Sequence, residues 1–385
     1  MKYPTTLADD GLVAWRELLA AETRRVTSRV VVLDRNEQPT GAVLPVVAGA
    51  INVDATADVT RSADVSALAL DDDLGFEADS PWGGAVFADR FIQIDYGVED
   101  PATGTLHWTP VFRGTVVRYE RSRPEIRLTA QGKESLMLAP VLPMFKRSPV
   151  VVPTGTRVDD AVKRIADACG ERLYDLPWTT RRKTQQKVTV GRLSEPWRAI
   201  RKIAKDAGMS VFYAGDGRLT MREPSSKPVV RFDADLLVSW PRITYDLGSD
   251  FRNVVLVVGV AEGKKDARPR GWGEAKKGDP LAPGALARNG APRWIAEYIE
   301  VDAKAQGKVN NIADAEHGRR MRQAVSVEFD ALVVPGLEEG DPAEVVPPGD
   351  RPYAFVADRF GVGLGTDAMS VGQARSVRVA QRVAT

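Results

Sequence analysis

The chain has 385 residues, with 53 Lys and Arg against 52 Asp and Glu, one cysteine and two histidines. A formal net charge of +1 excludes a whole-molecule field that recruits nucleic acid or an anionic membrane, so any electrostatic function must be local. One cysteine excludes an internal disulfide framework, and two histidines are too few for an ordinary zinc site, so we expect no metal or cofactor. The sequence shows no signal-peptide pattern and no run of about 18 apolar residues, which predicts a protein made in the cytoplasm that inserts into no membrane.

The first part of the chain has the composition of strands. A helical segment is expected within 1–24, over residues 12–23, and strand-like sequence follows at 25–33. Residues 51–67, INVDATADVTRSADVSA, alternate between small apolar and polar side chains, which places the odd positions on one face of a strand and the even positions on the other. Because strands average about 5 to 6 residues, so long a ribbon must bend, change partners or form part of a curved wall.

Further patterns extend this region into a mostly antiparallel β domain over 25–149. The sequence RSRP is a compact hairpin connection between two of its expected strands. Closely spaced prolines from Pro140 to Pro153 mark its end, because proline resists both helix interiors and central strands. Strands are expected at 90–96, 108–119 and 125–131.

The middle section, 150–227, predicts a small α+β domain with two amphipathic helices. Residues 161–170 and 199–208 both space their apolar side chains as a helix does, and both end in glycine, which suits the left-handed position beyond a helix end. The likeness of the two segments fits a duplication and fits shared helical amphipathicity equally well. Strand-like sequence follows each helix, and the second such strand ends at Asp216-Gly217, a strong hairpin signal.

From 228 to 385 the chain returns to strand patterns. Residues 251–260 form a continuous apolar run that predicts a strand buried on both faces. The stretch 261–293 is rich in Gly, Pro, Lys and Arg and is expected to be one long loop, which in globular proteins is usually functional or mobile. A helix over 312–323 and strands near 353–356 and 376–379 complete a second β-rich domain.

Motifs of known chemistry are sparse, and the sequence favours a protein that is not an enzyme. No GxSxG motif occurs, and His107 and His317 are expected at a loop or sheet edge and on a solvated helix surface. Cys169 lies on the apolar face of its helix, as a small buried hydrophobe does. A pair of carboxylates acting on a glycosidic bond stays open as an alternative, because such a pair is defined by its separation in space.

The expected long loop carries basic residues around a tryptophan. Such a cluster can grip phosphates while the indole stacks on a base, but interspersed carboxylates dilute its charge, so a contact with a partner protein is the preferred interpretation. The candidate contact residues are Lys264, Lys265, Arg268, Arg270 and Trp272.

Several segments in order resemble the minor tail proteins, or baseplate hubs, of long-tailed actinobacterial phages. They are LPVVAGAINVDATADVTRSADVSALAL, VFRGTVVRYERSRPEIRLTAQGKESL, EPWRAIRKIAKDAGMSVFYAGDGRLTMREP and DFRNVVLVVGV. The resemblance implies a β-rich α+β fold with two barrel-like antiparallel β domains, here 25–149 and 228–385, and a smaller α+β domain between them. It also implies a homotrimer at the virion tail tip, whose six barrels match a sixfold tail tube to a threefold tip.

Such a hub would contact distal tail or tail-tube proteins, the tape-measure protein and tail-tip proteins, and DNA would pass through it. We expect the long ribbon to help close sheet edges between subunits. Its even face carries Asp54, Asp58 and Asp64, which would repel DNA phosphates if it lined the channel; a solvated outer face explains the same pattern. Arg61 interrupts the apolar positions, so we expect it at a bend or against a carboxylate of a neighbouring subunit.

Two other functions stay open. The chain could be an enzyme that degrades cell-wall polysaccharide with two strand-borne carboxylates. It could also be a β-rich adhesin of the tail that binds carbohydrate through some of its eight tryptophans.

Overall fold

The structure is a computed structural model, in which the chain divides into two compact units. Unit 1 comprises Met1–Trp240, Phe329–Asp350 and Val356–Gly372, and unit 2 comprises Pro241–Glu328, Arg351–Phe355 and Gln373–Thr385. The structure describes residues 18, 24–68, 90–122, 124–138, 149–177, 181–191, 194–223, 225, 227–248, 251–261, 267–277, 279, 281–301, 304–323, 325–349, 352–365 and 369–379. Apart from Leu18, the helix expected over 12–23 lies outside these residues.

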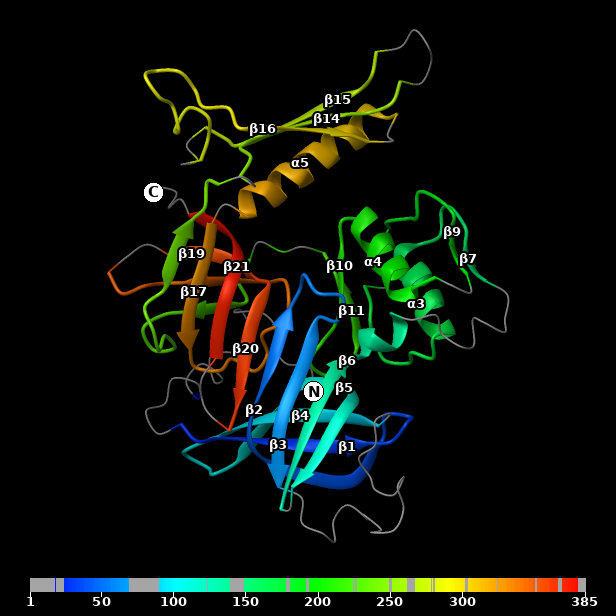
Figure 1. Cartoon of the computed structure of the whole chain (residues 1–385), viewed down its shortest axis with the longest axis vertical. Coiled ribbons are helices and arrows are strands. Elements are labelled where there is room, and N and C mark those ends of the chain that lie inside the picture. Colours follow the sequence, from blue (N-terminus) through cyan, green and yellow to red (C-terminus); the bar gives the residue numbers. More distant parts are fainter. Residues whose placement is uncertain are drawn as a thin grey trace. The chain divides into compact units, whose positions relative to one another are not determined.

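Unit 1 begins with a closed antiparallel barrel of six strands, paired in the order β1-β4-β5-β6-β3-β2 and back to β1 (Figure 1). Large apolar side chains such as Ile51, Ile94 and Leu128 are fully buried inside it. The RSRP turn joins β5 to β6, as expected from the sequence. The strands are β1 Val26–Leu33, β2 Pro39–Asp54, β3 Arg61–Leu68, β4 Phe91–Glu99, β5 Leu106–Ser122 and β6 Glu125–Gly132.

The alternating ribbon is a hairpin rather than one continuous strand. It runs along β2 to Asp54, turns over residues 55–60 and returns along β3, with Val53 opposite Arg61. Odd positions point inward, as the alternation predicts. The expectation that sister subunits close the sheet edges of this region is wrong for the barrel, because β1 and β2 pair within one chain.

A small α+β module follows, covering 150–222. Helices α3 Val158–Ala168 and α4 Pro196–Asp206 pack on each other around Trp197, whose side chain is fully buried. Both helices end at a glycine with positive φ, Gly170 and Gly208, which confirms the predicted stop signals. Its strands are β7 Val150–Val152 paired with β9 Val188–Val190, and β8 Tyr174–Asp175 next to β11 Leu219–Arg222, which pairs with β10 Ser210–Tyr213.

The barrel sheet continues into the carboxy-terminal strands through β2. The second half of β2 pairs with β3 on one side and with β20 on the other, from Gly49 opposite Leu364 to Asp54 opposite Arg359. Beyond β20 the sheet order is β21-β19-β18-β12. These strands are β12 Val230–Phe232, β18 Asp341–Val345, β19 Tyr353–Ala357, β20 Arg359–Leu364 and β21 Met369–Val379.

Unit 2 contains a sheet of three strands, in the order β15-β14-β16, with helix α5 on one face (Figure 1). Gly271 and Gly273 let the helix approach closely, because a Cβ at either position would lie 2.5 or 2.6 Å from the backbone oxygen of Val309 or Ala313. Strand β15 lies within 261–293, so the expectation of a single loop there is wrong. The elements are β14 Val254–Val258, β15 Arg270–Glu274, β16 Ala296–Glu300, α5 Gln306–Gln323 and the pair β13 Arg242–Tyr245 with β17 Val325–Ala331.

The surroundings of Cys169, His107 and His317 bear on whether these residues can carry chemistry. Cys169 caps α3, and burial raises the pKa of its thiol to about 11, which keeps it an unreactive thiol near neutral pH. His107 is exposed near the start of β5, whereas His317 on α5 is half-buried rather than solvated, and this burial lowers its pKa.

No helix among the described residues has the length and apolar character needed to cross a bilayer.

Candidate functional site

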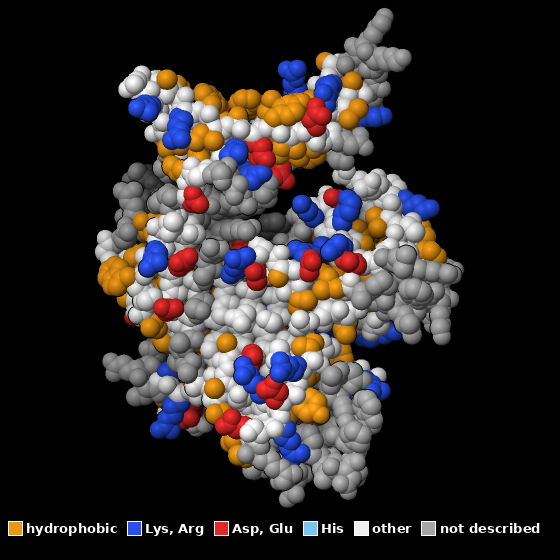
Figure 2. Space-filling model, viewed as in Figure 1, with side chains coloured by type: hydrophobic (Ala, Val, Ile, Leu, Met, Phe, Trp, Pro, Cys, Tyr) orange, Lys and Arg blue, Asp and Glu red, His pale blue; other side chains and the backbone are white. Residues whose placement is uncertain are grey.

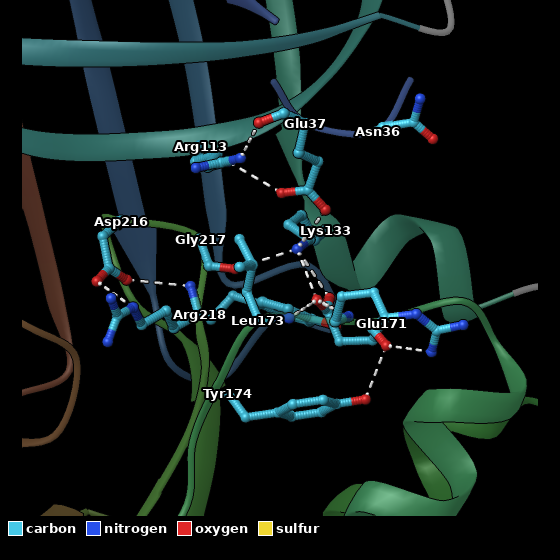
Figure 3. Close-up of polar contacts among 12 residues, drawn as sticks. Asn36, Glu37, Arg113, Lys133, Glu171, Leu173, Tyr174, Asp216, Gly217 and Arg218 are labelled. Carbon is cyan, nitrogen blue, oxygen red and sulfur yellow. Dashed lines mark hydrogen bonds and ion pairs between the residues drawn. The ribbon is translucent and has the colours of Figure 1, made fainter. Parts of the chain in front are cut away.

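Two clusters of buried charges lie within unit 1 between the barrel and the α+β module. The first surrounds Lys133, in the 3-10 helix η1 Lys133–Met137, whose side chain is 2% exposed (Figure 3). Its Nζ lies 2.7 Å from Glu37 Oε1 and 2.8 Å from Glu171 Oε2, and it donates to the Gly217 carbonyl at 3.1 Å. One ammonium group therefore joins the β1–β2 turn, the barrel end and the α+β module.

The partners of Lys133 are themselves held in place. Glu37 has a φ of 62°, a conformation that costs a residue other than glycine free energy, and Arg113 donates to its carbonyl oxygen at 2.6 Å. Arg113 Nε also lies 2.9 Å from Glu37 Oε2. On the other side, the Tyr213 hydroxyl donates to Glu171 Oε2 at 2.8 Å. We call Lys133, Glu37, Glu171, Arg113 and Tyr213 the lysine cluster.

The second cluster surrounds Arg61, at the first position of β3. Its side chain is 3% exposed; it donates to the backbone oxygens of Tyr213 at 3.2 Å and Val111 at 3.0 Å and pairs with the Glu338 carboxylate. The structure thus places Arg61 inside the fold, where its carboxylate partner belongs to the same chain. Arg61 follows the inward parity of the odd positions, and a buried carboxylate compensates its charge.

Acidic side chains outnumber basic ones around Arg61. Glu338 also accepts a hydrogen bond from the Gly215 amide at 3.0 Å, and Arg222 pairs with Asp341 at 2.6 Å. Burial raises the pKa of each carboxyl in the group, and for Glu339, which also faces the negative charge of Glu134, the pKa rises to about 8. We call Arg61, Arg222, Glu134, Glu338, Glu339 and Asp341, with the hydroxyl of Thr60, the acidic cluster.

The two most buried glutamates of the acidic cluster are closed to a polymer substrate. Glu134 is fully buried and Glu339 is 7% exposed, so a polysaccharide has no access to either carboxyl despite their raised pKa values. Within the described residues, no three His, Cys, Asp or Glu side chains are grouped to hold a metal ion. The ion pairs of the two clusters join the barrel to the α+β module and to the segment before β18.

The three aspartates proposed for the channel each have an arginine partner in the same chain. Asp54, at the end of β2, lies 3.0 Å from Arg359 Nε. Asp58, in the turn, lies 3.2 Å from Arg201 of α4, and Asp64 on β3 makes a two-bonded pair with Arg127 at 2.9 and 3.0 Å. Their side chains are 36%, 54% and 47% exposed, so all three reach solvent.

Of the proposed contact residues, Lys264 and Lys265 lie outside the described residues, and the others border an aromatic face in unit 2. Trp272 and Tyr298 stand directly across from Leu256 on the two sides of β14, on the face opposite α5. Trp272, Trp294 and Tyr298 are 53%, 51% and 56% exposed, and hydrophobic side chains gather over these strands in Figure 2. Arg268 pairs with Glu300 at 3.0 Å, and Arg270 lies at the exposed start of β15.

The outer surface of the barrel carries another exposed apolar row. Val43 and Val47 on β2 are both 45% exposed, and Pro45 between them is exposed as well. Val43 and Pro45 share one face of the strand because they alternate with inward-pointing Ala42 and Leu44, and exposed Val47 lies at the register shift between Val46 and Ala48.

Sequence reasoning missed both charge clusters. Lys133 and Glu134 stand in GKESLM as an ordinary polar turn, and their partners lie as much as 205 positions away, at Glu339. A local pattern offers no signal for a contact made by tertiary folding. The one available hint was the parity of Arg61, an inward position occupied by a cation.

Comparisons with solved structures show proteins of the same fold. The tail protein from Neisseria meningitidis MC58 aligns with a TM-score of 0.59 at 14% identity, over 91% of this chain and 96% of its own. The prophage MuSo2 43 kDa tail protein from Shewanella oneidensis aligns with a TM-score of 0.62 at 11% identity, over 91% and 98%. The prophage tail protein gp18 from Listeria monocytogenes EGD-e gives 0.51 at 7% identity, over 90% and 95%. No family model matches the chain, and no curated protein matches its sequence. Over nearly its whole length the chain therefore has the β-rich α+β fold of these three tail proteins.

Proposed function

We propose that the chain is a non-enzymatic structural protein of a bacteriophage tail tip, where three copies form a baseplate hub around the DNA exit channel. The observation that carries this proposal is the extent of the shared fold, which covers at least 90% of this chain and at least 95% of each of the three tail proteins. A catalytic domain shared by chance with a tail protein would align over only part of either chain.

The continuous sheet supports the hub geometry. β2 pairs with β20 over six residues, so a closed barrel and the carboxy-terminal strands are joined by backbone hydrogen bonds as well as by the chain. Two β regions per subunit, repeated by a threefold axis, give six around a ring, which matches a sixfold tube. In this arrangement distal tail or tail-tube proteins bind one side of the ring, and tape-measure and tail-tip proteins bind the other.

The exposed row on β2 is the proposed contact between subunits. Val43 and Val47 offer apolar area on a rigid strand, and obligate interfaces are apolar and commonly bury about 2,000 Å² or more. Asp54, Asp58 and Asp64 are proposed to face the channel. Because each is paired with an arginine, the wall that they form is close to neutral, which lets DNA pass without strong attraction or repulsion.

The mass of the purified protein tests this proposal. We expect a particle with three copies of the chain, formed either by the purified protein alone or after a tail partner is added. Electron micrographs should show a threefold ring. Val43→Asp with Val47→Asp should give folded monomers, because two buried carboxylates oppose association, whereas Val238→Asp, at another exposed apolar position, should leave the trimer intact. A wild-type chain that stays monomeric with tail-tube and tail-tip proteins present would contradict the proposal.

The aromatic face of unit 2 favours a second candidate, a carbohydrate-binding role at the tail. Trp272 and Tyr298 flank Leu256 across three neighbouring strands. The Trp272 indole N–H donates to Glu274 and the Tyr298 hydroxyl donates to Glu300, and these two carboxylates can also accept hydrogen bonds from sugar hydroxyl groups. Saturable binding of cell-wall glycan fragments by the wild type, lost in Trp272→Ala, would support it. Binding that survives this substitution would count against it.

A further inference from the structure

The three-stranded sheet of unit 2 has an open edge at β16. This strand pairs with β14 on one side and with no described strand on the other. The Val301 amide, just after β16, donates to the Val258 carbonyl of β14 at 3.0 Å, so the odd-numbered residues of β16 turn their backbone groups toward β14. The backbone N–H and C=O groups that point away from the sheet belong to Ala296, Tyr298 and Glu300.

The opposite edge, at β15, has the same arrangement. The Ala275 amide, just after β15, donates to the Asn253 carbonyl at 3.2 Å, so the odd-numbered residues of β15 face β14. Gln306 donates to the outward carbonyl of Arg270 at 2.6 Å, and this oxygen keeps a second lone pair for another donor. The residues with outward backbone groups are Arg270, Trp272 and Glu274.

Open edges of this kind are templates for a further strand. Neither β15 nor β16 contains the proline, lysine or bulge that commonly blunts an edge. The side chains of all six residues with outward backbone groups are exposed, and they lie on the face opposite α5. A strand added at either edge would therefore extend the aromatic face.

The two edges are complementary to each other. β15 runs antiparallel to β14 and β16 runs parallel to it, so β16 of one copy meets β15 of the next as an antiparallel pair when the copies are related by rotation about an axis along the strands. A register with Tyr298 opposite Trp272 aligns the outward backbone groups of both strands. It also places Glu300 opposite Arg270, and an aromatic pair and an ion pair both stabilise neighbouring strands.

The charges in this register are free to pair. Arg270 is exposed and makes no ion pair with any residue that the structure describes. Arg268 and the Tyr298 hydroxyl both donate to Glu300 Oε1, at 3.0 and 2.9 Å, which leaves Glu300 Oε2 for a second cation. Arg270 of a neighbouring copy supplies that cation.

We propose that β16 of each copy pairs with β15 of the next, so that the three unit 2 sheets join into one closed sheet of nine strands around the threefold axis. The inference rests on the proposed trimer and adds a contact within it. The contact is head-to-tail, so each copy provides one edge and accepts the other, and a threefold axis leaves no edge open.

Closure determines which face of the sheet lies inside. A barrel of about eight strands is just wide enough to hold its own side chains, so a ring of three such sheets has no room for α5, which must lie outside. Trp272, Trp294 and Tyr298, each about half exposed in one chain, then form the core of the ring. The closed ring blocks the proposed channel to duplex DNA, and the paired edges have to separate before DNA passes.

A disulfide between copies tests the register. Glu274 and Ala296 are opposite each other in the proposed pair, with about 5.5 Å between their Cα atoms, which a disulfide can span. Within one chain β14 separates them by two strand spacings, about 9.5 Å, which a disulfide cannot span. Under mild oxidation we expect Glu274→Cys with Ala296→Cys to run mainly as covalent dimers and trimers. Ala296→Cys alone, and the double-cysteine variant that also carries Val43→Asp and Val47→Asp, should stay single chains.

Hydrogen exchange at single residues tests the edge without cysteines. The outward amides of Tyr298 and Glu300 should exchange at least about tenfold more slowly in the wild-type trimer than in the Val43→Asp, Val47→Asp monomer. The amide of Ile299, which faces β14, should be equally protected in both.

The outcomes separate this inference from the proposed function. A trimer by mass that shows neither the cross-link nor the slower exchange would overturn the paired edges and leave the hub intact. A cross-link in Ala296→Cys alone would show that β16 pairs with itself and would overturn them as well. A chain that stays monomeric with its tail partners would overturn both proposals.

Discussion

The two charge clusters of unit 1 are both largely shielded from solvent but differ in how their charge is balanced. In the lysine cluster, Lys133 and Arg113 face the carboxylates of Glu37 and Glu171, so two cations meet two anions. In the acidic cluster, two arginines face four carboxyl groups. Fixed charges balance the first cluster, whereas the second has two acidic groups in excess, and burial raises the pKa of its carboxyls.

The difference has a physical origin in desolvation. An ion pair inside a protein loses the hydration of both members, so an unpaired buried charge costs several kcal/mol. Arginine cannot release its proton, and a carboxyl can take one up; an excess of acidic groups therefore adapts to burial by becoming neutral. Removing a cation should thus be costly in both clusters, and in the acidic one the cost should depend on pH.

Replacing Lys133 should have the largest effect. Lys133→Met keeps much of the side-chain volume but leaves Glu37 and Glu171 without their shared cation. We expect the free energy of unfolding to fall by about 3–5 kcal/mol at pH 7. Native-state hydrogen exchange in α3 and α4 measures this loss. Lys202→Met, which removes a cation paired with Asp206 at 2.9 Å on the surface of α4, should cost only about 0.3–0.5 kcal/mol. Equal losses for the two variants would remove the distinction between buried and exposed cations.

Replacing Arg61 tests how the acidic cluster responds to pH. Arg61→Leu leaves Glu338 without its arginine partner, and we expect the free energy of unfolding to fall by about 3 kcal/mol at pH 8. Burial already raises the pKa of Glu338, so at pH 5 this carboxyl can take up a proton and the loss should be smaller. Urea unfolding at both pH values gives the comparison, and an Arg61→Leu loss independent of pH would contradict it.

The backbone next to the lysine cluster offers a smaller effect. Gly217 has a φ of 77°, and a Cβ there would lie 2.5 Å from Arg113 Cδ, so Gly217→Ala combines a left-handed backbone with a steric clash. For Gly217→Ala we expect the free energy of unfolding to fall by about 2–3 kcal/mol. Gly104→Ala is the matched control, because its φ is 68° but no atom lies within 4 Å of the added Cβ, and about 1 kcal/mol is expected. Thermal unfolding of both variants gives the contribution of the clash as their difference.

Local patterns in the sequence predicted most elements of the fold. The helix ends at Gly170 and Gly208 and the turn at Gly217 depend on neighbouring residues only, and all three are observed. The parity of 51–67 correctly predicted which side chains point inward. The pairing of β2 with β20 and the closure of the barrel through β1 and β2 join distant segments, and no local pattern specifies them.

The same reason explains why the polar clusters were missed. Arg61 was expected at a bend or against a carboxylate of a neighbouring subunit because a cation seldom occupies an inward position, yet Glu338 of the same chain, 277 residues away, makes that position tolerable. The aromatic face of unit 2 was partly predictable, since Trp272 stood out among basic residues. Its neighbours Tyr298 and Leu256 come together only through the pairing of three strands.

The smallest effect is expected at the surface of the barrel, where charge pairs keep their hydration. Asp64 and Arg127 make two hydrogen bonds across β3 and β6, but their side chains are 47% and 59% exposed. Water and salt screen such a pair, so Asp64→Asn should leave the unfolding midpoint of the monomer unchanged within error. The same substitution in the assembled ring measures something different, because an unpaired Arg127 would add positive charge if this face lines the channel. Stronger binding of DNA by the assembled variant, weakened by added salt, is the expected result, and unchanged binding would place this face away from the channel.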